Sequence, residues 1–179
     1  MPSILPGYTC DIFISYRQND NRSGWVTEFV KALKEELAAA IKEPVSVYFD
    51  TNPHDGLLET HVVEDSLKEK MKCAIFLPIL SQTYSDPKGY AWTNEFLNFI
   101  KQNQESGGLK VKLANGNVAH RVLPVRIHEL DPGDKAAVEN EIGPLRAVDF
   151  VYASVGVNRP LTPHDKKDDN TNRLQYRDR

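Results

Sequence analysis

Two residues with the potential for chemistry, Trp92 and Glu95, lie at the start of a segment with helical periodicity. In a helix, Glu95 would project from the shoulder of an apolar arc, one turn from Trp92. That arc consists of Trp92, Phe96, Phe99 and Ile100. A carboxylate beside apolar packing is partly desolvated, and it can stabilise a developing positive charge or attack it as a nucleophile. The alternative is a surface glutamate beside a tryptophan that packs in the core.

The elements that must position these residues alternate along the chain. Short runs rich in β-branched and aromatic residues predict strands. They lie at residues 10–16, 45–49, 73–80, 121–127 and 146–152. Amphipathic spacing predicts helices between them, at residues 25–41, 59–72, 90–102 and 134–141. This alternation predicts an α/β fold, a flavodoxin-like five-stranded parallel sheet of order 2-1-3-4-5 with helices on both faces.

Two local features bear on this sheet. Pro78 lies inside the third strand, and we expect regular pairing to stop near it because proline has no amide N–H. Residues 107–117 predict an excursion or hairpin, with Asn115-Gly116 as its turn.

Ligands of such sheets bind at the carboxyl ends of the strands, near the switch point between strands 1 and 3. This edge carries Ser15, Tyr16 and Arg17, the loop that begins at Asp50, and the segment from residue 80 to residue 95. We therefore expect the candidate residues to converge on one rim of the sheet.

Composition limits the class of protein. A formal charge of -3 gives no support for a nucleic-acid partner. The N-terminus lacks a signal peptide, and the longest apolar run is far below the roughly 20 residues that span a bilayer. We expect a cytoplasmic chain with no membrane segment. Cys10 and Cys73 are far apart in the sequence, so we expect two buried reduced thiols and neither a metal site nor a disulfide framework.

We expect one domain over residues 1–155. Residues 156–179 become polar, and only Leu174 and Tyr176 among the last sixteen could be buried. We expect this segment to be a polar linker or the start of a terminal helix, leading to a partner domain outside the sequence.

Three segments together resemble the TIR domain over about residues 8–155. Asp11-Ile-Phe-Ile-Ser-Tyr-Arg17 is close to the first box of the family, and the Asp50–Gly56 loop stands in the place of its BB loop. Trp92 and Glu95 stand in the place of the catalytic glutamate and its preceding tryptophan. Many members separate those two by four residues, whereas this chain separates them by three. More narrowly, the chain resembles the bacterial TIR domains that cleave NAD+.

The resemblance implies an enzyme, an NAD+ glycohydrolase (NAD+ nucleosidase) that cleaves the nicotinamide–ribose bond and gives ADP-ribose or a cyclic ADP-ribose. It implies Glu95 as the catalytic residue, NAD+ as the substrate and no separate cofactor. The candidate substrate-binding residues are Ser15, Tyr16, Arg17, Asp50, Ser81 and Trp92. Structural roles are the alternative for several of them: packing for Tyr16 and Trp92, solvent exposure for Arg17, and a cap or turn for Ser81. No metal site is expected, because His54 and His61 lack ligand spacing.

The resemblance also implies self-association through TIR–TIR contacts and activation by a fused or partner sensor domain, as in an effector of bacterial antiphage defence. A second function is a non-catalytic TIR scaffold that signals through the Asp50–Gly56 loop; it would not need a carboxylate at Glu95. A receiver domain of a two-component system is disfavoured, because the acidic pair after the first strand and the lysine near the fifth are missing.

Overall fold

A five-stranded parallel sheet forms the centre of the molecule, in the order β2-β1-β3-β6-β7. This is a computed structural model, and it describes residues 3–50, 67–105, 108–112, 115–152, 154–165 and 176. The strands are β1 (Cys10–Ser15), β2 (Val47–Phe49), β3 (Cys73–Leu80), β6 (Val125–Arg126) and β7 (Val148–Asp149). The predicted α/β fold and the order 2-1-3-4-5 are confirmed, because β6 and β7 are the fourth and fifth strands of this sheet.

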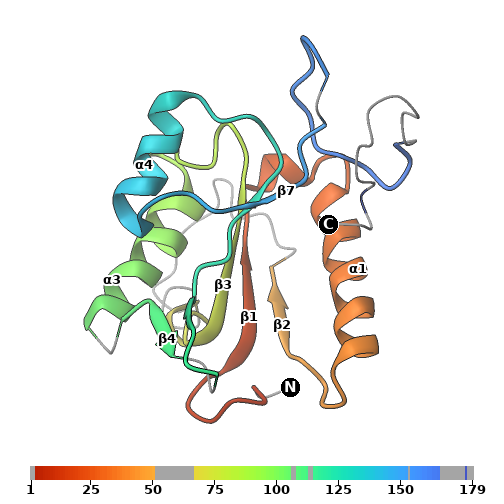
Figure 1. Cartoon of the computed structure of the whole chain (residues 1–179). Coiled ribbons are helices and arrows are strands. Elements are labelled where there is room, and N and C mark those ends of the chain that lie inside the picture. The colour runs from red at the N-terminus through yellow and green to blue at the C-terminus, as the bar shows by residue number, and fades with distance from the viewer. Residues whose placement is uncertain are drawn as a thin grey trace.

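Helices cover both faces of the sheet. Figure 1 shows α1 (Trp25–Ala40) on one side and α3 (Leu97–Glu105) and α4 (Pro132–Ile142) on the other. Two shorter helices lie between these elements. η1 (Gln18–Asn21) follows β1, and η2 (Ala91–Phe96) directly precedes α3.

The bounds of the long helices follow from local sequence. The chain leaves α1 at Ile41, which is extended at φ -122°, and Pro44 lies three residues further on. Asp131 caps α4, because its carboxylate accepts the amide N–H of Asp134 at 2.8 Å and Pro132 occupies the first turn.

From Ile12 in β1 and Phe76 in β3 onward, successive residues alternate between two cores, one on each face of the sheet. The core on the α3 side contains Cys10, Phe13, Cys73, Phe76 and Leu80 from these strands. The core on the α1 side contains Ile12, Ile14, Leu77 and Ile79. Ser15 at the end of β1 therefore faces the α3 side, and Tyr16 packs on the α1 side. Burial on both faces fixes the central strands and the direction of the side chains that follow them.

The expectation for Pro78 is wrong on one side of β3. Pairing with β1 continues to Ser15 opposite Pro78. The amide of Phe76 and the carbonyl of Leu80 both bond to the β6 side, so the position of Pro78 faces β6 and not β1. Between β3 and β6 the ladder is interrupted, from a single bridge at Phe76–Val122 to the pair Ile79–Val125. The missing N–H therefore falls where it removes no bond to β1.

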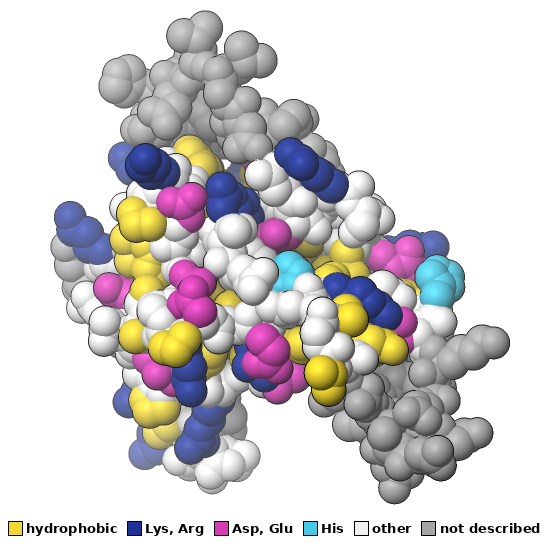
Figure 2. All heavy atoms as spheres, turned by 90° about the horizontal axis from the view of Figure 1, so that it is seen from above, with side chains coloured by type: hydrophobic (Ala, Val, Ile, Leu, Met, Phe, Trp, Pro, Cys, Tyr) yellow, Lys and Arg dark blue, Asp and Glu magenta, His cyan; other side chains and the backbone are white. Residues whose placement is uncertain are grey.

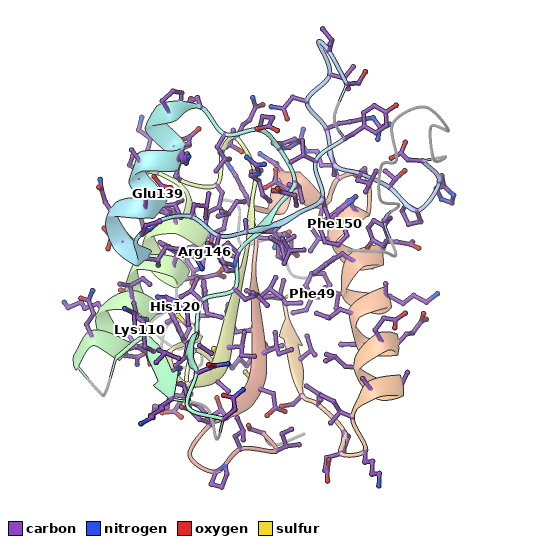
Figure 3. The ribbon with its side chains drawn as sticks, in the orientation of Figure 1. Phe49, Lys110, His120, Glu139, Arg146 and Phe150 are labelled. Carbon is purple, nitrogen blue, oxygen red and sulfur yellow. The ribbon has the colours of Figure 1, made fainter. Side chains whose placement is uncertain are left out.

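The predicted hairpin is present. β4 (Lys110–Lys112) pairs antiparallel with β5 (Val118–His120), and Gly116 in the turn has a φ of 86°, which favours glycine. Figure 3 shows Lys110 and His120, which are partners in this pairing, near α3. The hairpin is an insertion beside the main sheet and does not alter its strand order.

Residues beyond position 155 contribute to the core on the α1 side. The indole N–H of Trp25 donates to the carbonyl of Leu161 at 2.7 Å, and Tyr176 packs edge-on against Phe150 at 5.1 Å. Figure 3 shows Phe150 close to α1. Tyr176 is buried as predicted, Leu174 lies outside the described residues, and the domain boundary at 155 stays a prediction.

Most of the helix predicted at residues 59–72, including Val63, also lies outside the described residues. Its last part is helical, and Leu67 and Met71 are buried. Within the described ranges, no helix combines the length and the apolar character that crossing a bilayer requires.

Candidate active site at the carboxyl end of the sheet

The segment that carries Trp92 and Glu95 is a π-helix at its start. The amide N–H of Leu97 bonds to the carbonyl of Trp92, five residues back, in place of the four of an α-helix. One extra residue in a turn shifts the following side chains by about 100° around the axis. The predicted regular helix at 90–102 is therefore wrong in its first turn, and α3 itself begins at Leu97.

The π-turn places Glu95 inside the molecule. Its side chain is on the same buried surface as Trp92 and Phe96, and Glu95 is only 8% exposed. The expected position on a partly exposed shoulder is corrected accordingly. Trp92 stacks on Phe96 with ring centroids 4.8 Å apart and meets Tyr84 edge-on at 6.2 Å. Trp92 therefore packs in the core, which was the structural alternative to its predicted role in binding the substrate.

Two hydroxyl groups connect Glu95 to β1 and to the loop after β3. The hydroxyl of Ser15 donates to Oε2 of Glu95 at 2.5 Å, and it lies 2.8 Å from the hydroxyl of Tyr84. Since the one proton of Ser15 goes to Glu95, the Tyr84 hydroxyl is the donor to Ser15. Ser15 and Tyr84 are almost completely buried. The chain of hydrogen bonds fixes the carboxylate at the switch point between β1 and β3.

Burial raises the pKa of Glu95 to about 8, because a charged carboxylate is poorly solvated there. The hydrogen bond from Ser15 acts in the opposite direction, and the negative charge of Asp50 adds to the rise. Burial also raises the pKa of Tyr84 far above its ordinary range. Glu95 is therefore a carboxyl that can bind or release a proton near neutral pH, which is a property of functional acids.

Tyr16 and Asp50 form a second part of this rim. The hydroxyl of Tyr16 donates to the backbone carbonyl of Asp50 at 2.5 Å, and its ring packs on Phe49 at 5.3 Å. Burial raises the pKa of Tyr16 to about 12. Figure 3 shows Phe49 at the end of β2, beside α1. Asp50 is thus held at the rim near Glu95, while the rest of the loop to Gly56 lies outside the described residues.

The side chain of Arg17 contacts the loop after β3. Its guanidinium donates to the carbonyl of Thr83 at 2.9 Å and lies 3.5 Å from the carboxylate of Asp86. Asp86 also accepts the amide N–H of Lys88 at 2.9 Å, which is a turn role. The Arg17 side chain is 28% exposed, so it is anchored at the surface and still reaches solvent.

Ser81 is buried, and its hydroxyl accepts the amide N–H of Thr83 at 3.4 Å, which is a turn role. It also bonds to Asp20, a residue that our sequence reasoning passed over. Burial raises the pKa of Asp20 to about 6, and among the described residues its Oδ2 has no hydrogen-bond partner. Asp20 lies in η1, in the polar segment that follows β1, and this position near the carboxyl end of the strand is the sequence signal for the second carboxyl.

Charge on the rim is mixed. Figure 2, which looks onto the carboxyl end of the sheet, shows acidic and basic side chains interspersed over the described surface. Within the part of the chain that the structure describes, no three histidine, cysteine, aspartate or glutamate side chains are placed to hold a metal ion.

Comparisons with known proteins find distant likenesses among solved structures. No protein-family model matches the chain, and no curated protein matches it. Among solved structures, it is similar to the TIR domains in the structure of the activated Roq1 resistosome directly recognizing the pathogen effector XopQ. The identity is 15% and the TM-score 0.40, over 65% of this chain and 57% of that chain, so the match spans less than two thirds of the other protein. A likeness this weak adds nothing to the strand order and contacts described above.

Proposed function

We propose that the chain is an NAD+ glycohydrolase of the TIR type, with Glu95 as the catalytic carboxylate. The observation that carries the proposal is the buried carboxyl of Glu95, fixed by Ser15 and Tyr84 at the strand ends where ligands of such sheets bind. A buried acid at this edge is costly for stability, and a catalytic use would explain why the chain carries it.

The reaction suits one carboxylate. Nicotinamide leaves NAD+ as a neutral molecule from a cationic pyridinium, so no general acid has to protonate it. Positive charge develops on the ribose, as in other glycosyl transfers. Glu95 stabilises that charge, or attacks the anomeric carbon, more strongly in a buried site than in water.

Protonation would link binding to chemistry. With a pKa of about 8, about one Glu95 side chain in ten is ionised at pH 7 in the free protein. A bound nicotinamide ribosyl group brings a positive charge next to the carboxyl and lowers its pKa. The substrate itself therefore promotes the ionised form that the reaction needs.

The remaining rim residues would bind or position. Arg17, anchored by Thr83 and Asp86, offers its remaining guanidinium N–H groups to the diphosphate of NAD+. Asp50 stands at the rim near Glu95, where it would contact the substrate, and Tyr16 holds its backbone. Ser15 is a positioning residue, since its one proton is donated to Glu95.

The contacts of Ser81 and Trp92 favour support of the rim over direct contact with the substrate. We further propose that self-association completes the substrate site. A fused or partner sensor domain would drive this assembly, in a role in antiphage defence. The product, ADP-ribose or a cyclic ADP-ribose, is determined by the same experiment.

Incubation of the purified protein with NAD+, at several protein concentrations, tests the proposal. Chromatography of the nicotinamide and ADP-ribose products should show activity per molecule that rises with protein concentration. Glu95→Gln should lower turnover by about a hundred-fold or more. The matched control is Glu28→Gln, because Glu28 is an exposed glutamate on α1.

A Glu95→Gln protein that folds and cleaves NAD+ at the wild-type rate would contradict the catalytic assignment. If wild-type protein releases no nicotinamide even where sedimentation shows self-association, the non-catalytic TIR scaffold becomes the better description.

A further inference from the structure

Cys10 and Cys73 are neighbours in the folded protein, although 63 positions separate them in the sequence. Each is the first residue of its strand, β1 and β3, and the two are directly paired in the parallel register. Both are free cysteines, and both belong to the core on the α3 side. Both thiols are buried and reduced, as expected, and the fold brings them together.

The pairing matches what a disulfide requires. Neighbouring strands lie about 4.7–4.9 Å apart, and cysteines joined by a disulfide have Cα atoms about 4.4–6.8 Å apart. Paired residues of a parallel sheet point to the same face, so the side chains of Cys10 and Cys73 extend from their strands in the same direction. Because both residues begin their strands, the backbone on one side of each can adjust without breaking the ladder.

The two thiols differ in access and in their partners. Cys10 lines a cavity of about 650 Å³ between the end of α1 and the start of β2, together with Tyr48 and Lys70. Cys73 is fully buried behind it. The thiol of Cys10 bonds to the carbonyl of Lys70 at 3.3 Å, and the Lys70 ammonium lies over the Tyr48 ring at 4.4 Å. A small oxidant entering this cavity therefore meets Cys10 first.

The thiols of Cys10 and Cys73 also differ in acidity. The hydrogen bond from Cys73 lowers the pKa of Cys10 most, with smaller help from Thr9 and Lys70, against burial and the charge of Asp11. Burial raises the pKa of Cys73 above its ordinary range. Cys10 is thus the thiol more readily ionised, and the thiolate is the form that reacts.

We propose that Cys10 and Cys73 are a redox pair, oxidised by hydrogen peroxide to a reversible disulfide between β1 and β3. The Cys10 thiolate attacks peroxide, forming the sulfenic acid and releasing hydroxide. The Cys73 sulfur then attacks the Cys10 sulfur, and the sulfenic hydroxyl leaves with the Cys73 proton as water. Peroxide accepts the two electrons, and a small dithiol returns both cysteines to the thiol form by exchange.

The wild-type protein is treated with hydrogen peroxide, then denatured with an alkylating reagent present. Free thiols should fall from the two that the sequence contains to none, and non-reducing peptide mapping should join the Cys10 peptide to the Cys73 peptide. Dithiothreitol should restore both thiols. NAD+ plays no part in this assay, so its result is independent of the proposed enzyme activity.

Two variants separate the steps. Cys73→Ala should leave Cys10 as a sulfenic acid that dimedone traps, whereas Cys10→Ala should leave Cys73 unmodified over the same time. Glutathione treated with the same dose of peroxide is the control for oxidation. If that dose oxidises all the glutathione and the wild-type protein still keeps both thiols, the proposal is overturned. Cross-links found only between molecules, in protein whose circular dichroism is native, would also overturn it.

Discussion

Replacement of the buried Glu95 by glutamine should change how the stability of the protein depends on pH. The folded protein holds the Glu95 proton up to a pKa of about 8, from an ordinary value of 4.5. The unfolded chain therefore releases this proton first as the pH rises. Ionisation then favours the unfolded state, and the free energy of unfolding falls between about pH 4.5 and pH 8. Glutamine has no proton to release, so Glu95→Gln should remove this fall.

The size of the effect follows from the pKa difference, at about 1.4 kcal/mol for each pKa unit. Between pH 4.5 and pH 7 the Glu95 carboxyl should lower the free energy of unfolding by about 3 kcal/mol. This is a large part of the total stability of an ordinary domain, about 5–15 kcal/mol. The absolute stability of Glu95→Gln also depends on how its new amide N–H groups are paired, so the informative quantity is the change with pH.

Urea unfolding at a series of pH values measures this quantity. Trp25 and Trp92 are both buried, so intrinsic fluorescence reports unfolding. The difference in free energy of unfolding between Glu95→Gln and wild type should rise by about 3 kcal/mol from pH 4.5 to pH 7. Subtraction removes contributions from the other titrating groups, and the exposed Glu28→Gln should follow wild type.

A difference between Glu95→Gln and wild type that stays flat across this range would refute the reasoning. It would mean that Glu95 is ionised in the folded protein at pH 5, as a solvated or ion-paired carboxylate would be. The proposed link between substrate charge and Glu95 ionisation would then be lost as well.

Three further substitutions test the surroundings of this carboxyl. Trp92→Ala should lower the free energy of unfolding by about 3–5 kcal/mol in urea followed by circular dichroism, because a buried aromatic ring is deleted. Ser15→Ala should cost about 1–3 kcal/mol, since Glu95 and Tyr84 lose their common partner. It should also move the pH dependence assigned to Glu95 upward, because the Ser15 hydrogen bond lowers that pKa. For Asp20→Asn, the difference in free energy of unfolding from wild type should rise by about 2 kcal/mol from pH 4 to pH 7. The reason is that burial raises the pKa of Asp20 in the folded protein to about 6. A difference that stays the same at both pH values would contradict the burial of Asp20.

Local sequence patterns were sufficient to predict the order of the sheet. Apolar runs such as Cys73–Leu80, and the spacing of apolar residues along α1, indicate which face of each element is buried. The rule that crossover connections are right-handed then leaves few possible strand orders. The Asn115-Gly116 turn predicted the hairpin in the same way. Each of these features depends on residues that are close together in the chain.

The state of the candidate site depended on tertiary structure. Regular helical periodicity put Glu95 on a partly exposed shoulder, whereas one π-turn buries it, and no pattern of apolar residues encodes that extra residue. Its contact with Ser15 spans 80 positions of the sequence. Such contacts depend on strand register and on the path of loops, which bring distant residues together; the pKa of a carboxyl is then determined by the burial that results. The sequence by itself therefore determined which residues stand at this edge of the sheet, and only the tertiary structure decided which of them touch.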